Sequence, residues 1–106
     1  MSGHQPPQDV AHAAQRAVDW INDGKAGSGF TDTGRRRAQQ LADREPVPEG
    51  DIKKMQQYFK RHAVDSDAEG FNQGEQGYPT PGRVAWDAWG GDPGREWVSR
   101  EKFKNL

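Results

Sequence analysis

The chain has no cysteine among its 106 residues, which excludes disulfide bonds and thiolate-ligated zinc as sources of stability. Apolar residues make up only 31% of the sequence. No apolar run approaches the ~18 residues that a membrane-spanning helix requires. The first eight residues are polar and contain two prolines, unlike a secretory signal peptide. We therefore expect a soluble protein with no membrane partner that is not exported through a signal peptide.

Aromatic residues are the main apolar mass that is present, with four Trp, four Phe and two Tyr. Each can bury roughly 150–250 Å². We expect Trp86, Trp89 and Trp97 to anchor a thin core. An alternative is a binding surface, because exposed aromatic side chains concentrate at interfaces and stack on bases. Trp86 lies off the helical face formed by Ala85, Ala88 and Trp89, so it is the tryptophan of this group expected to be partly exposed.

The spacing of apolar residues predicts an all-α fold, a small bundle of four to five short helices. We expect helices at about residues 10–21, 34–44, 48–62, 81–89 and 93–103. Thr33, Thr80 and Asp92 are the expected N-caps of the second, fourth and fifth helices. Residues 63–79 are predicted to form a long Gly-rich loop, and residues 1–8 a flexible N-terminus ahead of one domain at 9–106. No segment shows the period-two pattern of a strand.

Positive charge is concentrated in the middle of a chain whose net charge is -1. Residues 30–62 carry eight basic and five acidic side chains, a local net charge of +3. Residues 37–59 also fit a helix-turn-helix template, with Ala42, Val47, Ile52 and Met55 at its small and apolar positions and Pro46 where glycine is usual. The alternative is two ordinary bundle helices with solvated basic faces. The candidate nucleic-acid-binding residues are Arg35, Arg36, Arg37, Lys53, Lys54, Gln57, Lys60 and Arg61.

No pattern typical of an enzyme or a cofactor site is present. The three histidines do not occur in metal-binding or catalytic motifs. The segment from Asp65 to Gly70 matches the first half of a calcium-binding EF-hand loop, but Gln76 occupies the position that requires a bidentate glutamate. We therefore expect a non-enzymatic protein without a metal or cofactor.

Several stretches between residues 34 and 98 resemble a small helical module of tailed bacteriophages. The most specific are Phe59-x-Arg61-His62 and the stretch GRVAWDAWGGD at residues 82–92. The family copies are encoded among virion head genes or fused to portal, protease or other head-associated proteins, and they have no assigned reaction. The resemblance implies a phage accessory module that acts in the virion or in the host cytoplasm.

Two functional hypotheses follow from the sequence. The first is a module that binds DNA through the local basic patch on the helix-turn-helix-like pair. The second is a structural, protein-binding component of the phage head or its assembly. The near-neutral net charge suits the second hypothesis, because a protein partner, unlike packaged DNA, need not repel acidic segments.

Overall fold

The computed structural model describes residues 3–27 and 30–106, and within them it confirms the predicted helical bundle. The α-helices are α1 (Gln8–Asn22), α2 (Asp32–Ala42), α3 (Glu49–His62), α4 (Pro81–Ala88) and α5 (Gly91–Val98). Two 3-10 helices, η1 (Ala63–Asp67) and η2 (Glu101–Phe103), and two short strands, β1 (Gly3–His4) and β2 (Val47–Pro48), complete the described elements.

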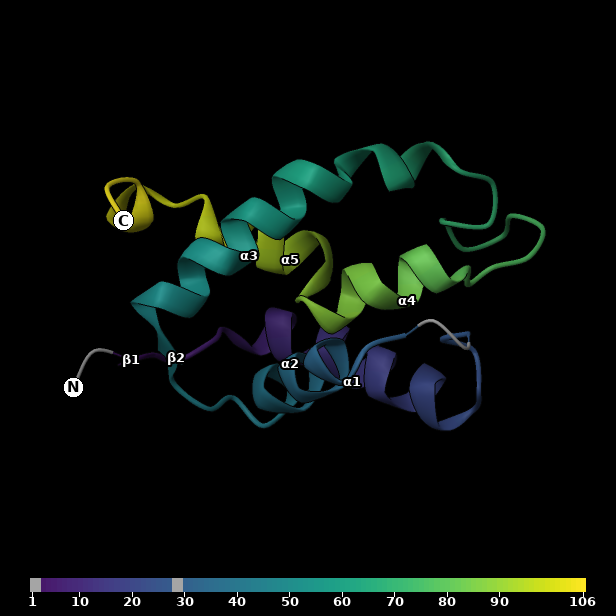
Figure 1. Ribbon diagram of the computed structural model, residues 1–106, viewed down its shortest axis with the longest axis horizontal. Coiled ribbons are helices and arrows are strands. Elements are labelled where there is room, and N and C mark those ends of the chain that lie inside the picture. The colour runs from purple at the N-terminus through teal and green to yellow at the C-terminus, as the bar shows by residue number, and fades with distance from the viewer. Residues whose placement is uncertain (1–2, 28–29) are drawn as a thin grey trace.

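Helices α4 and α5 form the middle of the molecule (Figure 1). Helix α1 packs against α2, α4 and α5 on one side, and α3 packs against α5 on the other. Helix α2 packs mainly against α1 and α4. A helix-turn-helix unit requires its two helices to pack against each other. The helix-turn-helix arrangement predicted for α2 and α3 is therefore not the one in the structure.

Local capping interactions set the starts of two helices. The Thr80 hydroxyl accepts a hydrogen bond from the Arg83 amide at 3.2 Å, and Pro81 is the first residue of α4, as predicted. The predicted cap of α2 is wrong by two residues, because the Thr31 hydroxyl rather than that of Thr33 accepts from the Gly34 amide.

The start of α5 also differs from the prediction. The helix begins at Gly91, after Gly90 has turned the chain with a positive φ of 113°. The carboxylate of Asp92, expected to cap this helix, accepts a hydrogen bond from the indole Nε1 of Trp86 at 3.0 Å. The sharp turn brings α5 back beside α4 and gives the buried indole its polar partner.

The predicted last helix is interrupted after Val98. The Gln56 side-chain amide donates hydrogen bonds to the carbonyls of Val98 and Phe103, each at 3.0 Å. The chain is extended at Arg100 and then forms η2, which buries Phe103 edge-on against Trp97 with a centroid separation of 5.6 Å. A single straight helix would not bring Phe103 back onto Trp97.

The aromatic core includes Trp86 and Trp97, each only 1% exposed. The prediction that Trp86 is partly exposed is wrong. Its ring packs edge-on against Phe59 and Phe71, with centroid separations of 4.9 and 5.7 Å. The half-buried tryptophan of this group is Trp89. Helix α4 has neighbours on more than one side, so its second face is buried as well.

The sequence predicts a flexible N-terminal segment at residues 1–8. In the structure, contacts with the rest of the chain hold this segment from residue 3 onward, and residues 1 and 2 lie outside the described chain. Strand β1 pairs antiparallel with β2, placing Gly3 opposite Pro48 and His4 opposite Val47. Pro6 is fully buried, and its carbonyl accepts a hydrogen bond from Arg44 Nε at 2.8 Å. Strands of two residues are too short to show a sequence period, so the sequence did not indicate them.

The predicted long loop begins with η1 and then crosses to α4 through a series of turns. Arg83 Nη1 donates to the Phe71 carbonyl at 2.8 Å, and the guanidinium lies 5.2 Å from the Phe71 ring centroid. The Glu75 carboxylate accepts from the backbone amides of Gly70 and Asn72. These hydrogen bonds lower the pKa of Glu75. Side chains within and beside the loop therefore hold it in place.

Across residues 3–27 and 30–106, no helix has both the length and the apolar content needed to cross a lipid bilayer.

Candidate functional site

Adjoining cavities lie beside α3. Two of them are lined by residues of both α2 and α3, and another by residues of α3, of α4 and of the segment before α2. One cavity has a volume of about 440 Å³ and is lined by residues that include Phe30, Gly34, Lys54, Tyr58, Arg61 and Trp89. A second, of about 590 Å³, shares Phe30, Tyr58, His62 and Ala85 with it. A third, lined in part by Arg36 and Arg37, adjoins the first at Lys54. We refer to these adjoining cavities as the α2–α3 trough.

A column of stacked side chains forms one side of the trough and connects three helices. The Tyr58 ring of α3 stacks on Trp89 at the end of α4, with centroids 4.6 Å apart and planes at 3°. His62 also stacks on Tyr58, at 4.5 Å. The Arg37 guanidinium of α2 lies 5.1 Å from the Trp89 ring centroid. We call Arg37, Trp89, Tyr58 and His62 the aromatic column.

The environment of Tyr58 keeps its phenol neutral. Burial raises the pKa of Tyr58 far above its ordinary value, and the nearby carboxylates of Asp65 and Asp87 raise it further. Tyr58 therefore contributes an uncharged ring to the column.

Arg37 belongs to this column and not to the basic surface. Its side chain is only 8% exposed, and Nη1 lies 3.2 Å from Asp51 Oδ2 and donates to Gln40. The ion pair ties α2 to α3 across the trough. Of the eight predicted nucleic-acid-binding residues, this one is buried by the fold.

The other seven predicted residues are exposed: Arg35, Arg36, Lys53, Lys54, Gln57, Lys60 and Arg61. The structure divides those on α3 into two groups. Lys54, Gln57 and Arg61 line the 440 Å³ cavity, whereas Lys53 and Lys60 are not among its lining residues. The spacing of the lining residues places them on one face of α3.

Most of these cations have no acidic partner. Among the described residues, Arg35, Arg36, Lys53, Lys60 and Arg61 form no ion pair, and Lys54 lies 4.0 Å from Asp51. The charge of the first five is therefore available to a ligand without the loss of an existing ion pair, whereas Lys54 would exchange its contact with Asp51.

Sequence reasoning missed Phe30 and His62 as lining residues, and it offered Trp89 only as part of an alternative aromatic binding surface. Phe30 precedes α2, Trp89 ends α4 and His62 ends α3. No local spacing connects residues so far apart in the chain. The only sequence indication was their aromatic or imidazole character.

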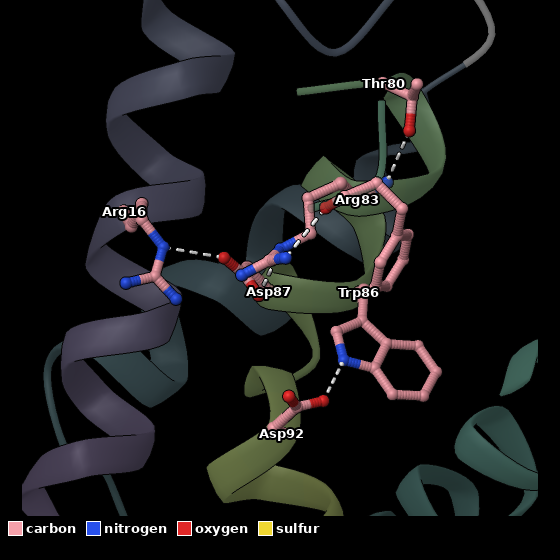
Figure 2. Close-up of polar contacts among 7 residues, drawn as sticks. Arg16, Thr80, Arg83, Trp86, Asp87 and Asp92 are labelled. Atoms are coloured by element: carbon pink, nitrogen blue, oxygen red, sulfur yellow. Dashed lines mark hydrogen bonds and ion pairs between the residues drawn. The ribbon is translucent and has the colours of Figure 1, made fainter. Parts of the chain in front are cut away.

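A second polar cluster, inside the bundle, is built around Asp87 (Figure 2). Asp87 is 0% exposed. Its Oδ2 accepts from Arg16 Nε of α1 at 2.8 Å, and its Oδ1 lies 3.3 Å from Arg83 Nε. Burial raises the pKa of Asp87, and the hydrogen bond from Arg16 and the charge of Arg83 partly oppose this shift. The cluster ties α1 to α4.

Comparison with protein-family models, curated proteins and solved structures found no match. The stretch at residues 82–92, which carried much of the phage resemblance, contains Trp86, Asp87, Gly90 and Gly91. All of these residues are buried. A Cβ at position 91 would come within 2.8 Å of Asp87 Oδ1, which explains the glycine. The buried residues of this stretch therefore build the fold, whereas Ala85 and Trp89 also line the trough.

In the part of the chain that the structure describes, no three His, Asp or Glu side chains gather in a way that could hold a metal ion. In the EF-hand-like segment, Asp65 Oδ2 lies 3.1 Å from His62 Nδ1, and the Gly70 amide donates to Glu75.

Proposed function

We propose that the protein binds nucleic acid through the exposed cations of α2 and α3. One observation carries the proposal: these two helices present Arg35, Arg36, Lys53, Lys60 and Arg61, which have no ion-pair partner among the described residues. Several arginines elsewhere have an acidic partner, since Arg16 and Arg83 share Asp87, and Arg100 faces Glu96. Cations without acidic partners can neutralise phosphates and release the counterions condensed on a nucleic acid.

The test is titration of a fluorescently labelled oligonucleotide, followed by anisotropy at low salt and then at increasing salt. We expect log K to fall linearly with log salt concentration. The double variant Arg35→Glu/Arg36→Glu should weaken binding strongly. The matched control is Lys25→Glu/Lys102→Glu, which makes the same change in net charge at exposed positions away from α2 and α3.

Two outcomes would contradict this proposal. One is the absence of a complex at micromolar protein and low salt. The other is equal weakening by the α2 variant and the control variant, which would mean that only net charge matters. Circular dichroism of each variant checks that the helical content is unchanged. Arg37 is left intact because its substitution would disturb the aromatic column.

The second candidate function is that of a structural, protein-binding component of a phage head. It is favoured by the resemblance over residues 34–98 and by the net charge of -1. The test is mass spectrometry of purified virions, together with co-purification of the chain with head components. Absence from virions and failure to co-purify would remove this candidate.

A further inference from the structure

We propose that the α2–α3 trough takes a single strand of nucleic acid in preference to a duplex, with an unpaired base against Phe30 and phosphates at Lys54 and Arg61. This inference rests on the proposed function and specifies its ligand.

The shape of the site favours a single strand. A helix that recognises duplex DNA enters the major groove and presents its side chains on a convex surface. Here Lys54, Gln57 and Arg61 line a cavity of about 440 Å³. This volume is in the range of roughly 300–1,000 Å³ typical of pockets for small molecules, and it suits one nucleotide unit but not a duplex.

Phe30 is the ring best placed to receive a base. The rings of Tyr58 and Trp89 are engaged within the aromatic column. Phe30 stacks on no other ring among the described residues, and the Arg35 guanidinium lies 6.0 Å from its centroid. Because unpaired bases expose their faces, they can stack on such a ring.

A glycine holds the Phe30 ring in position. A Cβ at Gly34 would lie 2.9 Å from Phe30 Cζ, so only glycine lets the ring lie this close to α2. The ring is therefore supported by the first turns of α2 while it lines the cavity.

The α3 wall supplies the complementary charge. Lys54 and Arg61 are seven positions apart, which corresponds to about 10 Å along the helix axis. Gln57 lies between them on the same wall and offers both a hydrogen-bond donor and an acceptor. Two cations and an amide on one wall match the alternating phosphates and bases of a strand that runs along α3.

The experiment compares a thymidine oligonucleotide with a mixed-sequence duplex of equal length, at one low salt concentration, by fluorescence anisotropy. The variant Phe30→Leu removes the aromatic face but keeps apolar bulk against Gly34, whereas Phe30→Tyr keeps the face. The double variant Lys54→Gln/Arg61→Gln removes two positive charges from the wall of the trough. Its matched control Lys53→Gln/Lys60→Gln removes the same charge from exposed positions of the same helix.

We expect the single strand to bind more tightly than the duplex. Phe30→Leu should weaken single-strand binding by roughly tenfold, since base stacking contributes about this much, while Phe30→Tyr should bind like the original chain. Lys54→Gln/Arg61→Gln should weaken single-strand binding more than its control does. Thermal melting of each variant shows whether it is folded. If Phe30→Leu does not fold, the paired α3 variants still decide the question.

The outcomes separate the trough from the general basic surface. If both α3 variants weaken single-strand binding equally, or if the duplex binds as tightly as the single strand, the trough inference is wrong and the proposed function stands. If neither nucleic acid binds the original chain, both proposals fail.

Discussion

The substitution Arg16→Gln tests the buried cluster around Asp87. Arg16 Nε donates to the Asp87 carboxylate at 2.8 Å, and Asp87 is 0% exposed. A hydrogen bond to a charged group contributes about 1.5–3 kcal/mol. We reduce this to about 1–2 kcal/mol because the Arg16 side chain is 45% exposed, and exposed pairs are screened by solvent. Contact of the guanidinium with Trp20, at 5.8 Å, adds about 0.5 kcal/mol.

The expected loss at pH 7 is therefore about 1.5–2.5 kcal/mol in the free energy of unfolding, or roughly 10 °C in Tm for a domain of this size. Urea denaturation followed by tryptophan fluorescence measures it. The matched control is Arg100→Gln, which breaks an exposed pair with Glu96 and should cost much less stability, because water screens that pair.

The pH dependence of the loss gives a sharper test. Burial raises the folded-state pKa of Asp87 above its ordinary 3.8, and removal of Arg16 raises this pKa further. A carboxyl whose pKa is higher in the folded state than in the unfolded state destabilises the fold when it is ionised. The original chain and the variant therefore both gain stability as the pH falls through the folded-state pKa of Asp87. Because Asp87 has the higher pKa in Arg16→Gln, this variant begins to gain stability at a higher pH than the original chain does. The penalty should therefore shrink toward the contribution of Trp20 as the pH approaches 4, and a penalty constant from pH 7 to pH 4 would refute the assignment.

Three further predictions concern local structure. Thr80→Ala removes the cap of α4 and should cost about 1 kcal/mol in urea denaturation, whereas no change would contradict the capping role. Gly91→Ala forces an alanine to a φ of 66° and should lower stability by at least about 1–2 kcal/mol in thermal melting; an unchanged Tm would contradict this strain. The lowered pKa of Glu75 means that its stabilisation is present above its ordinary 4.5 and is lost as the pH falls through the lowered value. Proteolysis of the loop around Glu75 should therefore be faster for Glu75→Gln at pH 7, and equal rates would contradict this contact.

Helix positions could be predicted from the sequence because they depend on interactions within a few residues. Thr80 and Pro81 fix the start of α4, and the end of α1 at Asn22 lies one residue beyond the predicted end. The choice between Thr31 and Thr33 as the cap of α2 was harder, since either residue can cap a helix. Close packing of Phe30 on Gly34 accompanies the earlier start.

The burial of Trp86 shows the limit of an argument from one helix. A surface helix has one apolar face and one solvated face, and this pattern predicts that residues off the apolar face are exposed. Helix α4 instead lies in the middle of the bundle (Figure 1). Neighbours on more than one side leave Trp86 1% exposed, and Asp92 satisfies its indole N–H.

The candidate site was predicted in part. The sequence indicated the basic side chains of α2 and α3, because charge and helical spacing are local properties. It could not separate Lys54 and Arg61 from Lys53 and Lys60, since all four are exposed positions of one helix. That distinction depends on which face of α3 lies beside the trough.

The sequence by itself determined approximately where the helices lie, the cap of α4 and which segment carries positive charge. Only the tertiary structure decided that Arg37 is buried beside Trp89, and that Phe30, Tyr58 and Trp89 line one cavity. The physical reason is the range of the interactions. Hydrogen bonds and side-chain contacts within a helix join residues three or four apart, whereas the trough depends on how α2, α3 and α4 pack, across more than 50 positions of the chain.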